Sequence, residues 1–279
     1  MTICVGVKVN DCIVFVADSA SSMVAQGPSG PVISRVYNHG DKLFNLYRGL
    51  PVAAMTCGLG AFGRESIATI AKGIRVDLMA EDSEITPENY AIEAIANFAC
   101  DRFRAKFEVL DPAVREGSSF EFFVGGYSAK ATDSEVWKFQ FGPGQTGSPT
   151  CIAGHDHPDI VWAGQPEAIV RLVFGIPSSL TEILKETGLA DAQVANLVSL
   201  IQQRAQAQFL EAAMPVRDAI ELARFLAQTA ASYVRFLPGA DTIGGDLDVA
   251  TVTKFEGFRW ISRKHFYSPA LNPETDHVR

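Results

Sequence analysis

The chain has 279 residues, a net charge of −8 and a sequence pI of about 5.2, and 47% of its residues are hydrophobic. Those proportions suit a globular protein with one sizeable core or two small ones. Because no basic stripe is visible and no apolar run approaches the ~18 residues that span a membrane, we expect neither nucleic acid nor a membrane among its partners.

The chain opens with a predicted β-hairpin. Residues 3–9 alternate between apolar and other residues with a period of two, an Asn-Asp turn follows, and a second apolar run covers 12–17. If the turn is placed this way, paired residues have numbers that add up to 21, so Asp18 lies opposite Ile3. We therefore expect Asp18 and the start of the chain to be neighbours, since a one-residue slip would turn the side chains over.

The later elements are predicted from their periodicity and their punctuation. Residues 19–40 are rich in Ser, Gly and Pro and are expected to form a long loop. Further strands are predicted at 42–47, 51–57, 120–124, 135–141, 160–163, 247–253 and 258–262. Helices are predicted at about 64–80, 86–107 (capped by Thr86), 165–174, 179–187 (with a Ser179 and Glu182 capping box), 191–212 and 216–234.

Strands and helices are grouped in this order and do not alternate one by one. That grouping favours an α+β fold with largely antiparallel sheets over a doubly wound fold. No repeat, low-complexity tract or linker stands out, so we expect a single domain over residues 1–279 with a loose polar tail from about 268.

The N-terminus and two charged residues suggest a chemistry. Threonine is a weak nucleophile, but a Thr at the chain terminus carries its own base, a free α-amine with an unperturbed pKa of about 7.7–8.0. Thr2 would become terminal once Met1 is removed, and its small side chain suits Met-removing aminopeptidases. A nearby ammonium would lower the pKa of that amine, and a carboxylate would hold the ammonium. Asp18 is placed to supply the carboxylate and Lys42 the ammonium.

Four segments of the chain resemble the opening of proteasome β-subunits. They are T-I-x-V-G-V from Thr2, V-F-V-A-D-S-A, D-K-L-F-N-L and A-M-T-C-G-L-G-A. They are equally similar to two bacterial relatives, the proteolytic subunit of the ATP-dependent two-component protease and the ancestral β-subunit group. The segments 216–223 and 242–249 resemble later parts of the family, so the resemblance reaches both ends of the chain.

The resemblance implies a four-layer αββα sandwich, the fold of N-terminal-nucleophile hydrolases. It implies that Thr2 is the nucleophile, that Asp18 and Lys42 tune its amine, and that the Gly58 backbone N–H receives the oxyanion. The implied reaction is amide hydrolysis of polypeptides through an acyl-Thr2 intermediate, with no metal and no cofactor. The implied partners are other copies of the chain in a self-compartmentalised ring or spiral, and a possible ATPase unfoldase.

The chain departs from the family pattern at several places. Ser22 stands where a substrate-binding Thr is common, and the loop before Lys42 is longer than usual. Gln165 occupies the place of a supporting Ser, and Asp241 is the nearest match to a supporting carboxylate. Helices at about 177–213 look like an insertion. These departures leave open a catalytically idle ring or scaffold subunit.

Two further motifs carry competing hypotheses. The segment 58–63 is a literal G-x-G-x-x-G after a strand, and Asp82 lies about 20 residues on, as in a dinucleotide site. Antiparallel-looking strand pairs precede it, so we favour the hydrolase, in which the same glycine turn can serve an oxyanion. The segment 155–157, His-Asp-His, lacks a third ligand and is expected to be a solvated loop.

The cysteines and the first residues bear on the cellular compartment. No CxxC pair occurs among the five cysteines, four of which sit in apolar runs. We expect buried, reduced thiols. The N-terminal segment lacks the basic start and the long apolar stretch of a signal peptide, so we expect a cytoplasmic protein.

Overall fold

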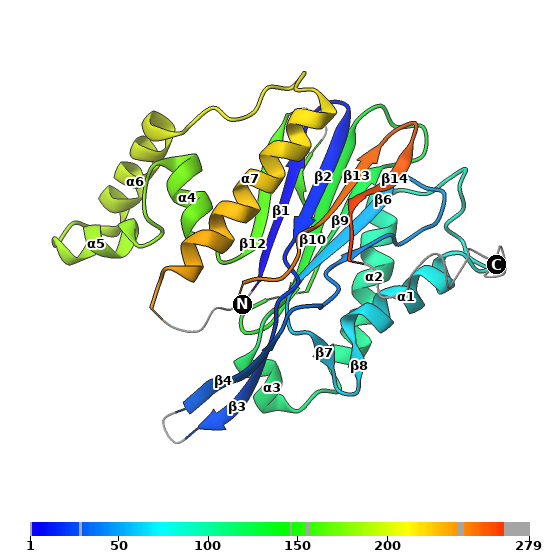
Figure 1. The fold of residues 1–279 in the computed structure, drawn as a ribbon, viewed down its shortest axis with the longest axis horizontal. Coiled ribbons are helices and arrows are strands. Elements are labelled where there is room, and N and C mark those ends of the chain that lie inside the picture. The colour runs from blue at the N-terminus through cyan, green and yellow to red at the C-terminus, as the bar shows by residue number, and fades with distance from the viewer. Residues whose placement is uncertain (1, 28–29, 146, 155–156, 239–242, 265–279) are drawn as a thin grey trace.

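The structure is a computed structural model that describes residues 2–27, 30–145, 147–154, 157–238 and 243–264 (Figure 1). One sheet contains β1 (Ile3–Lys8), β2 (Cys12–Ala17), β12 (Asp159–Gly164), β13 (Asp248–Thr253) and β14 (Gly257–Ser262). The other contains β5 (Leu43–Phe44), β6 (Val52–Gly58), β9 (Phe120–Tyr127), β10 (Ser134–Phe141) and β11 (Thr150–Ala153). Two separate hairpins are formed by β3 (Ser21–Gly27) with β4 (Gly30–Tyr37) and by β7 (Ala61–Phe62) with β8 (Glu65–Ser66). The helices are α1 (Ile67–Leu78), α2 (Ile92–Phe107), α3 (Pro112–Gly117), α4 (Glu167–Phe174), α5 (Leu180–Glu186), α6 (Asp191–Ala205) and α7 (Val216–Arg235).

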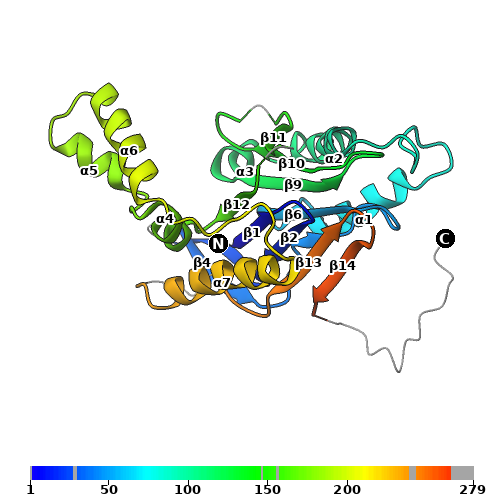
Figure 2. The same cartoon turned by 90° about the horizontal axis from the view of Figure 1, so that it is seen from above.

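The two five-stranded sheets lie face to face between helices (Figure 2). The first has the order β12-β1-β2-β13-β14 and the second β11-β10-β9-β6-β5. Helices α4 and α7 cover the outer face of the first sheet, and α1 and α2 cover that of the second. All the strand pairs described are antiparallel. The α+β class and the four-layer αββα arrangement are confirmed.

Three apolar clusters hold these layers together. One lies between the sheets around Phe15, Met55 and Phe123. A second, rich in aromatic rings, lies beneath α1 and α2, where Phe103 and Phe122 have ring centroids 4.8 Å apart. A third packs the first sheet against α7. Both faces of β1 and β2 are therefore buried, and the start of the chain is anchored in the centre of the molecule.

The first hairpin has the predicted register. Cys4 pairs with Ala17 and Val5 with Val16, so the numbers of paired residues add up to 21. The Val9 N–H donates to the Cys12 carbonyl over 2.9 Å and closes the predicted turn. This confirms that Ile3 lies opposite Asp18, whose N–H donates to the Ile3 carbonyl over 3.1 Å.

Three local predictions are wrong. The expected loop at 19–40 contains the β3–β4 hairpin, which projects from the body of the molecule (Figure 1). The second helix begins at Ile92, because Thr86 instead closes a tight turn in which its N–H donates to Asn89 Oδ1 over 2.8 Å. Ser179 makes no side-chain cap bond at the start of α5, so the capping box is not formed there. The sequence did not predict α3 or β11.

The segment between α4 and α7 forms a helical arm. Helix α6 packs on α4 and carries α5, and both stand away from the sandwich in Figures 1 and 2. The predicted tail from about 268 and the predicted site residue Asp241 lie outside the described residues. Within the described ranges, no helix has the length and the apolar character that crossing a bilayer requires.

Candidate active site

Asp18 is the centre of the polar contacts at the start of the chain. Its side chain is 0% exposed. One oxygen, Oδ1, accepts from the Lys42 ammonium over 2.6 Å and from the Ile3 N–H over 3.0 Å. The other, Oδ2, accepts from the N–H groups of Ala20 over 3.1 Å and Gly244 over 3.2 Å. Four donors thus compensate for the hydration that this buried carboxylate loses.

Thr2 is held directly beside that carboxylate. It precedes β1 and is 6% exposed. The peptide bond that follows it donates its N–H to Asp18, and its carbonyl accepts from the Gln165 N–H over 3.0 Å. Gly164 lies against the same carbonyl with a φ of +99°, and a Cβ there would fall 1.7 Å from the Thr2 oxygen. Only glycine lets the end of β12 approach Thr2 this closely.

Lys42 comes to Asp18 from the other sheet. It immediately precedes β5, its carbonyl accepts from the Thr56 N–H over 3.0 Å, and the residue is 7% exposed. The long segment before it folds out as the β3–β4 hairpin, and the Gly40 N–H donates to the Ser19 carbonyl over 2.8 Å at the base. The structure therefore brings Thr2, Asp18 and Lys42 together despite the extra length.

Gly58 ends β6 at a backbone position that requires glycine. Its φ is +98°, and a Cβ would fall 2.1 Å from the Ser119 carbonyl oxygen. The residues after it form the β7–β8 hairpin, and α1 starts only at Ile67, capped by Ser66. A dinucleotide site needs a parallel βαβ unit at this point. The described strands form no such unit, so the competing interpretation of segment 58–63 finds no support.

The remaining predicted site residues take varied positions. Ser22 lies in β3, and its hydroxyl oxygen is buried with no hydrogen-bond partner among the described residues. Gln165 contacts Thr2 through its main chain. In the segment 155–157, only His157 is described, and its carbonyl accepts from Lys8 Nζ over 2.8 Å. The described part of the chain contains no cluster of three or more metal-ligand side chains.

Two thiols line the same region but remain protonated. The Cys4 thiol donates to the Thr56 carbonyl over 3.1 Å. Burial raises the pKa of Cys4 well above its ordinary value and that of Cys57 to about 12. A thiol attacks as its thiolate, so neither cysteine can serve as a nucleophile near neutral pH. The prediction that the cysteines in apolar runs are buried and reduced agrees with free, buried Cys4, Cys12, Cys57 and Cys100.

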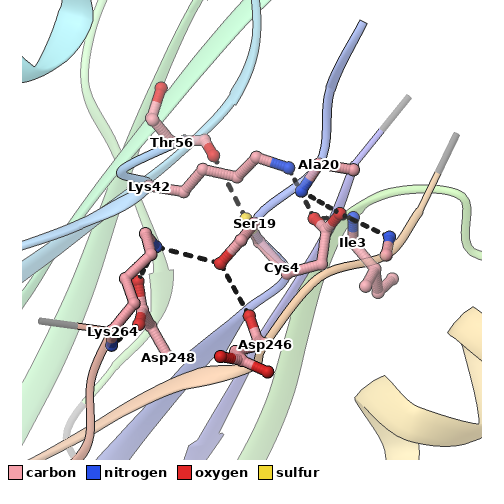
Figure 3. A network of polar contacts seen from close by, with 11 residues as sticks. Ile3, Cys4, Ser19, Ala20, Lys42, Thr56, Asp246, Asp248 and Lys264 are labelled. Carbon is pink, nitrogen blue, oxygen red and sulfur yellow. Dashed lines mark hydrogen bonds and ion pairs between the residues drawn. The ribbon is translucent and has the colours of Figure 1, made fainter. Parts of the chain in front are cut away.

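A second buried ion pair, which the sequence did not predict, lies near the pair of Lys42 and Asp18. Lys264 follows β14 and contacts Asp248 at the start of β13 and the hydroxyl of Ser19 (Figure 3). No local sequence pattern marked Lys264 and Asp248 as an ion pair. Lys264 stands next to a polar tail, and its partners Asp248 and Ser19 are 16 and 245 residues away. Gly164 did carry a weak sequence signal for a special backbone position, because it is a glycine at the end of a predicted strand.

Comparison with known proteins gives a likeness of fold. No model of a protein family matches the chain, and no curated protein matches it. Among solved structures, Anbu (ancestral beta-subunit) from Yersinia bercovieri has a TM-score of 0.52 and 14% identity, over 94% of this chain and 88% of that one. The Anbu (Gly-1) mutant from Hyphomicrobium sp. strain MC1 has a TM-score of 0.51 and 14% identity, over 95% and 86%. The chain therefore has the proteasome β-subunit-like fold of the N-terminal-nucleophile hydrolases, which it shares with these Anbu structures.

Proposed function

We propose that the chain is an N-terminal threonine hydrolase that cleaves amide bonds, with Thr2 as its nucleophile after removal of Met1. The observation that carries this proposal is the buried ion pair between Lys42 and Asp18, which is hydrogen-bonded to the peptide N–H directly after Thr2. A buried ammonium and a carboxylate at the start of a chain are the groups that convert a terminal amine into a base.

The proposed reaction runs in two steps. In the first, the Thr2 α-amine takes the Oγ proton as Oγ attacks the substrate carbonyl, and the Gly58 N–H stabilises the oxyanion. The proton then passes to the leaving nitrogen, the C–N bond breaks and an ester to Thr2 remains. In the second step, water attacks the ester with the amine again as base, the bond between the acyl carbon and Oγ breaks, the proton passes from the amine to Oγ and the acid is released. Lys42 keeps the amine neutral, and Asp18 holds Lys42 in place.

The wider proposal concerns substrate and assembly. We propose polypeptide substrates, with Ser22 in a binding role and with Gln165 and Asp241 as supporting residues. We further propose a cytoplasmic homo-oligomer that encloses its Thr2 sites, with an ATPase unfoldase as a possible partner. An unspecific amide-cleaving site is safe among folded proteins only where they cannot reach it. The chain would form a single domain over 1–279, with residues 177–213 as an insertion.

A second candidate is a catalytically idle subunit of the same fold. The observation in its favour is Gln165, which lies against Thr2 where the resemblance calls for a serine hydroxyl. Such a protein would keep the fold and the assembly without forming an acyl-enzyme.

One labelling experiment separates the two candidates. A peptide epoxyketone can bond to both the hydroxyl and the amine of an N-terminal threonine, and intact mass spectrometry detects the adduct. We expect one adduct per chain on the Thr2 peptide, none in Thr2→Ala, and unchanged labelling in Thr132→Ala, which alters an exposed threonine. Absence of any adduct in correctly processed wild-type protein, together with no hydrolysis of amide substrates, would favour the idle subunit.

A further inference from the structure

The Lys264 ammonium is buried among three oxygen-bearing residues. Its side chain is 4% exposed, as is that of Asp248, with which it forms an ion pair. Its Nζ also donates to Ser19 Oγ over 2.9 Å and lies 3.8 Å from Asp41 Oδ1. The Lys264 backbone N–H donates to the other Asp248 oxygen over 3.0 Å, so this residue is held from both ends.

These contacts fall on the immediate neighbours of the proposed catalytic pair. Ser19 follows Asp18 in the chain, and Asp41 precedes Lys42. Asp248 pairs across the sheet with Ala17, the residue before Asp18. One ammonium therefore contacts side chains from all three of these segments.

Ser19 connects the Lys264 contacts to Asp18 through hydrogen bonds. Its hydroxyl donates to the Asp246 carbonyl over 2.6 Å, and its N–H donates to the Gly244 carbonyl over 3.0 Å. The N–H of Gly244 in turn donates to Asp18 Oδ2. Figure 3 shows the Ser19 side chain between Lys264 and Asp246, with a dashed contact to each.

Stability alone does not account for a buried lysine at this place. Replacing a buried ion pair by apolar residues of similar volume is often neutral or stabilising, so the pair is weak evidence for a stabilising role. A charged pair with defined geometry does fix position, since each oxygen must meet its donor. The position fixed here is that of the segments on either side of Asp18 and Lys42.

We propose that Lys264 is a positioning residue for the Asp18–Lys42 pair, holding it in register with Thr2 through Ser19, Asp41 and Asp248. This inference rests on the proposed function, because Thr2 must be the reacting residue for the register to matter. Loss of the Lys264 side chain would let the Lys42 ammonium move away from the Thr2 amine. The pKa of that amine would then approach the pKa of the α-amine of a free peptide.

The test follows the Thr2 amine itself and needs no turnover. In processed protein labelled with ¹³C-threonine, the Thr2 methyl shift is recorded against pH and is assigned by its loss in Thr2→Ser. In Lys264→Met, we expect the midpoint to rise by about half a pH unit or more, and epoxyketone labelling at pH 7 to slow correspondingly. Lys254→Met is the matched control, because Lys254 is an exposed lysine in the turn of the same β13–β14 hairpin.

A double variant covers the case in which Lys264→Met does not fold. Lys264→Met with Asp248→Asn removes both charges and leaves an acceptor for the Lys264 N–H. A folded single or double variant that titrates and labels like the wild type overturns the inference. If the wild type is never labelled but the amine midpoint still moves, the proposed function fails, and only the structural part of the inference, the coupling of Lys264 to the Thr2 amine, is supported. If the wild type is labelled and the midpoint does not move, only the inference fails.

Discussion

The Lys42 ammonium lies 2.6 Å from Asp18 Oδ1 although 24 residues separate the two in the chain. The intervening segment leaves and returns as the β3–β4 hairpin, and the bond between the Gly40 N–H and the Ser19 carbonyl joins its two ends. The length of the segment between them therefore does not set the distance between these charges. Each residue is placed by its own sheet.

Lys42→Met should remove the activity and leave the fold. The Thr2 amine would lose its charged neighbour, so it would hold its proton to higher pH and serve poorly as a base near pH 7. We expect a loss of at least about 100-fold in the labelling rate, as for removal of a general base. The control is Lys72→Met, which alters an exposed lysine of α1.

The remaining hydrogen bonds of Asp18 should limit the loss of stability in Lys42→Met. Breaking a buried pair by removing one partner typically costs about 3–5 kcal/mol. Here three backbone N–H groups continue to bond the carboxylate, so we expect a value at or below the lower end. Thermal unfolding of Lys42→Met and the wild type gives the comparison. Near-normal labelling in a folded Lys42→Met would show that another cation tunes the amine.

The mature chain should begin at Thr2. The proposed base is a free α-amine, and in the unprocessed chain that nitrogen belongs to the peptide bond with Met1. Mass spectrometry of the purified N-terminus should show loss of Met1, and a permanent N-terminal extension should abolish labelling. Active protein that retains Met1 would contradict the mechanism.

Sequence reasoning placed Asp18 correctly because a local feature determines its position. The Asn-Asp turn determines the pairing of the first hairpin, and the pairing alone brings Asp18 to the start of the chain. The β3–β4 hairpin was missed because none of the residues in its strands whose burial is described is buried, and Met23, Val24 and Val32 are about half exposed or more. Without a burial contrast, no period-two pattern marks a strand.

The Lys264 network was beyond the sequence for a different reason. A buried ion pair is recognised by where two charges meet, and no local pattern encodes a contact between Ser19 and Lys264, 245 residues apart. Thr86 shows the same limit on a shorter scale. Its hydroxyl suits a helix cap, but in the structure the Thr86 N–H donates to the Asn89 side chain in a turn ahead of α2, and the helix itself begins at Ile92 without a side-chain cap bond.

Alkylation of the native protein at pH 8 should modify Cys151 and spare the thiols near Thr2. Burial raises the pKa of all three thiols, but Cys151 is exposed to the reagent, whereas Cys4 and Cys57 are buried. The raised pKa of Cys57, about 12 against an ordinary 9.0, contributes stability that is fully present below about pH 9 and is lost as the pH rises toward 12. Peptide mapping after brief iodoacetamide treatment measures the order, and rapid modification of Cys57 would contradict it.

Gly58→Ala should destabilise the protein more than Gly49→Ala. Both glycines have positive φ, +98° and +85°, so both variants carry the left-handed penalty of about 1–2 kcal/mol. At Gly49 a new Cβ meets nothing within 4 Å, but at Gly58 it meets the Ser119 oxygen at 2.1 Å. The difference between the melting temperatures of Gly58→Ala and Gly49→Ala therefore measures the effect of the contact with the Ser119 oxygen. Equal values would mean that the end of β6 can move away from Ser119.

The protein should sediment as a homo-oligomer of several 30.1 kDa chains at micromolar concentration. Helices α1 and α2 are rich in apolar residues, so they are candidates for the contacts between copies. The apolar side chains of α2 are largely used in the chain's own core, whereas α1 leaves Val76 67% exposed. Val76→Glu should therefore shift the sedimentation profile toward smaller species, because a charge would enter the contact. The same substitution at Val109, which is 82% exposed beyond the end of α2, is the matched control.

A wild-type monomer in moderate salt would contradict the enclosed assembly and favour a free-standing hydrolase of small amides, with the helical arm at 177–213 as a lid over Thr2.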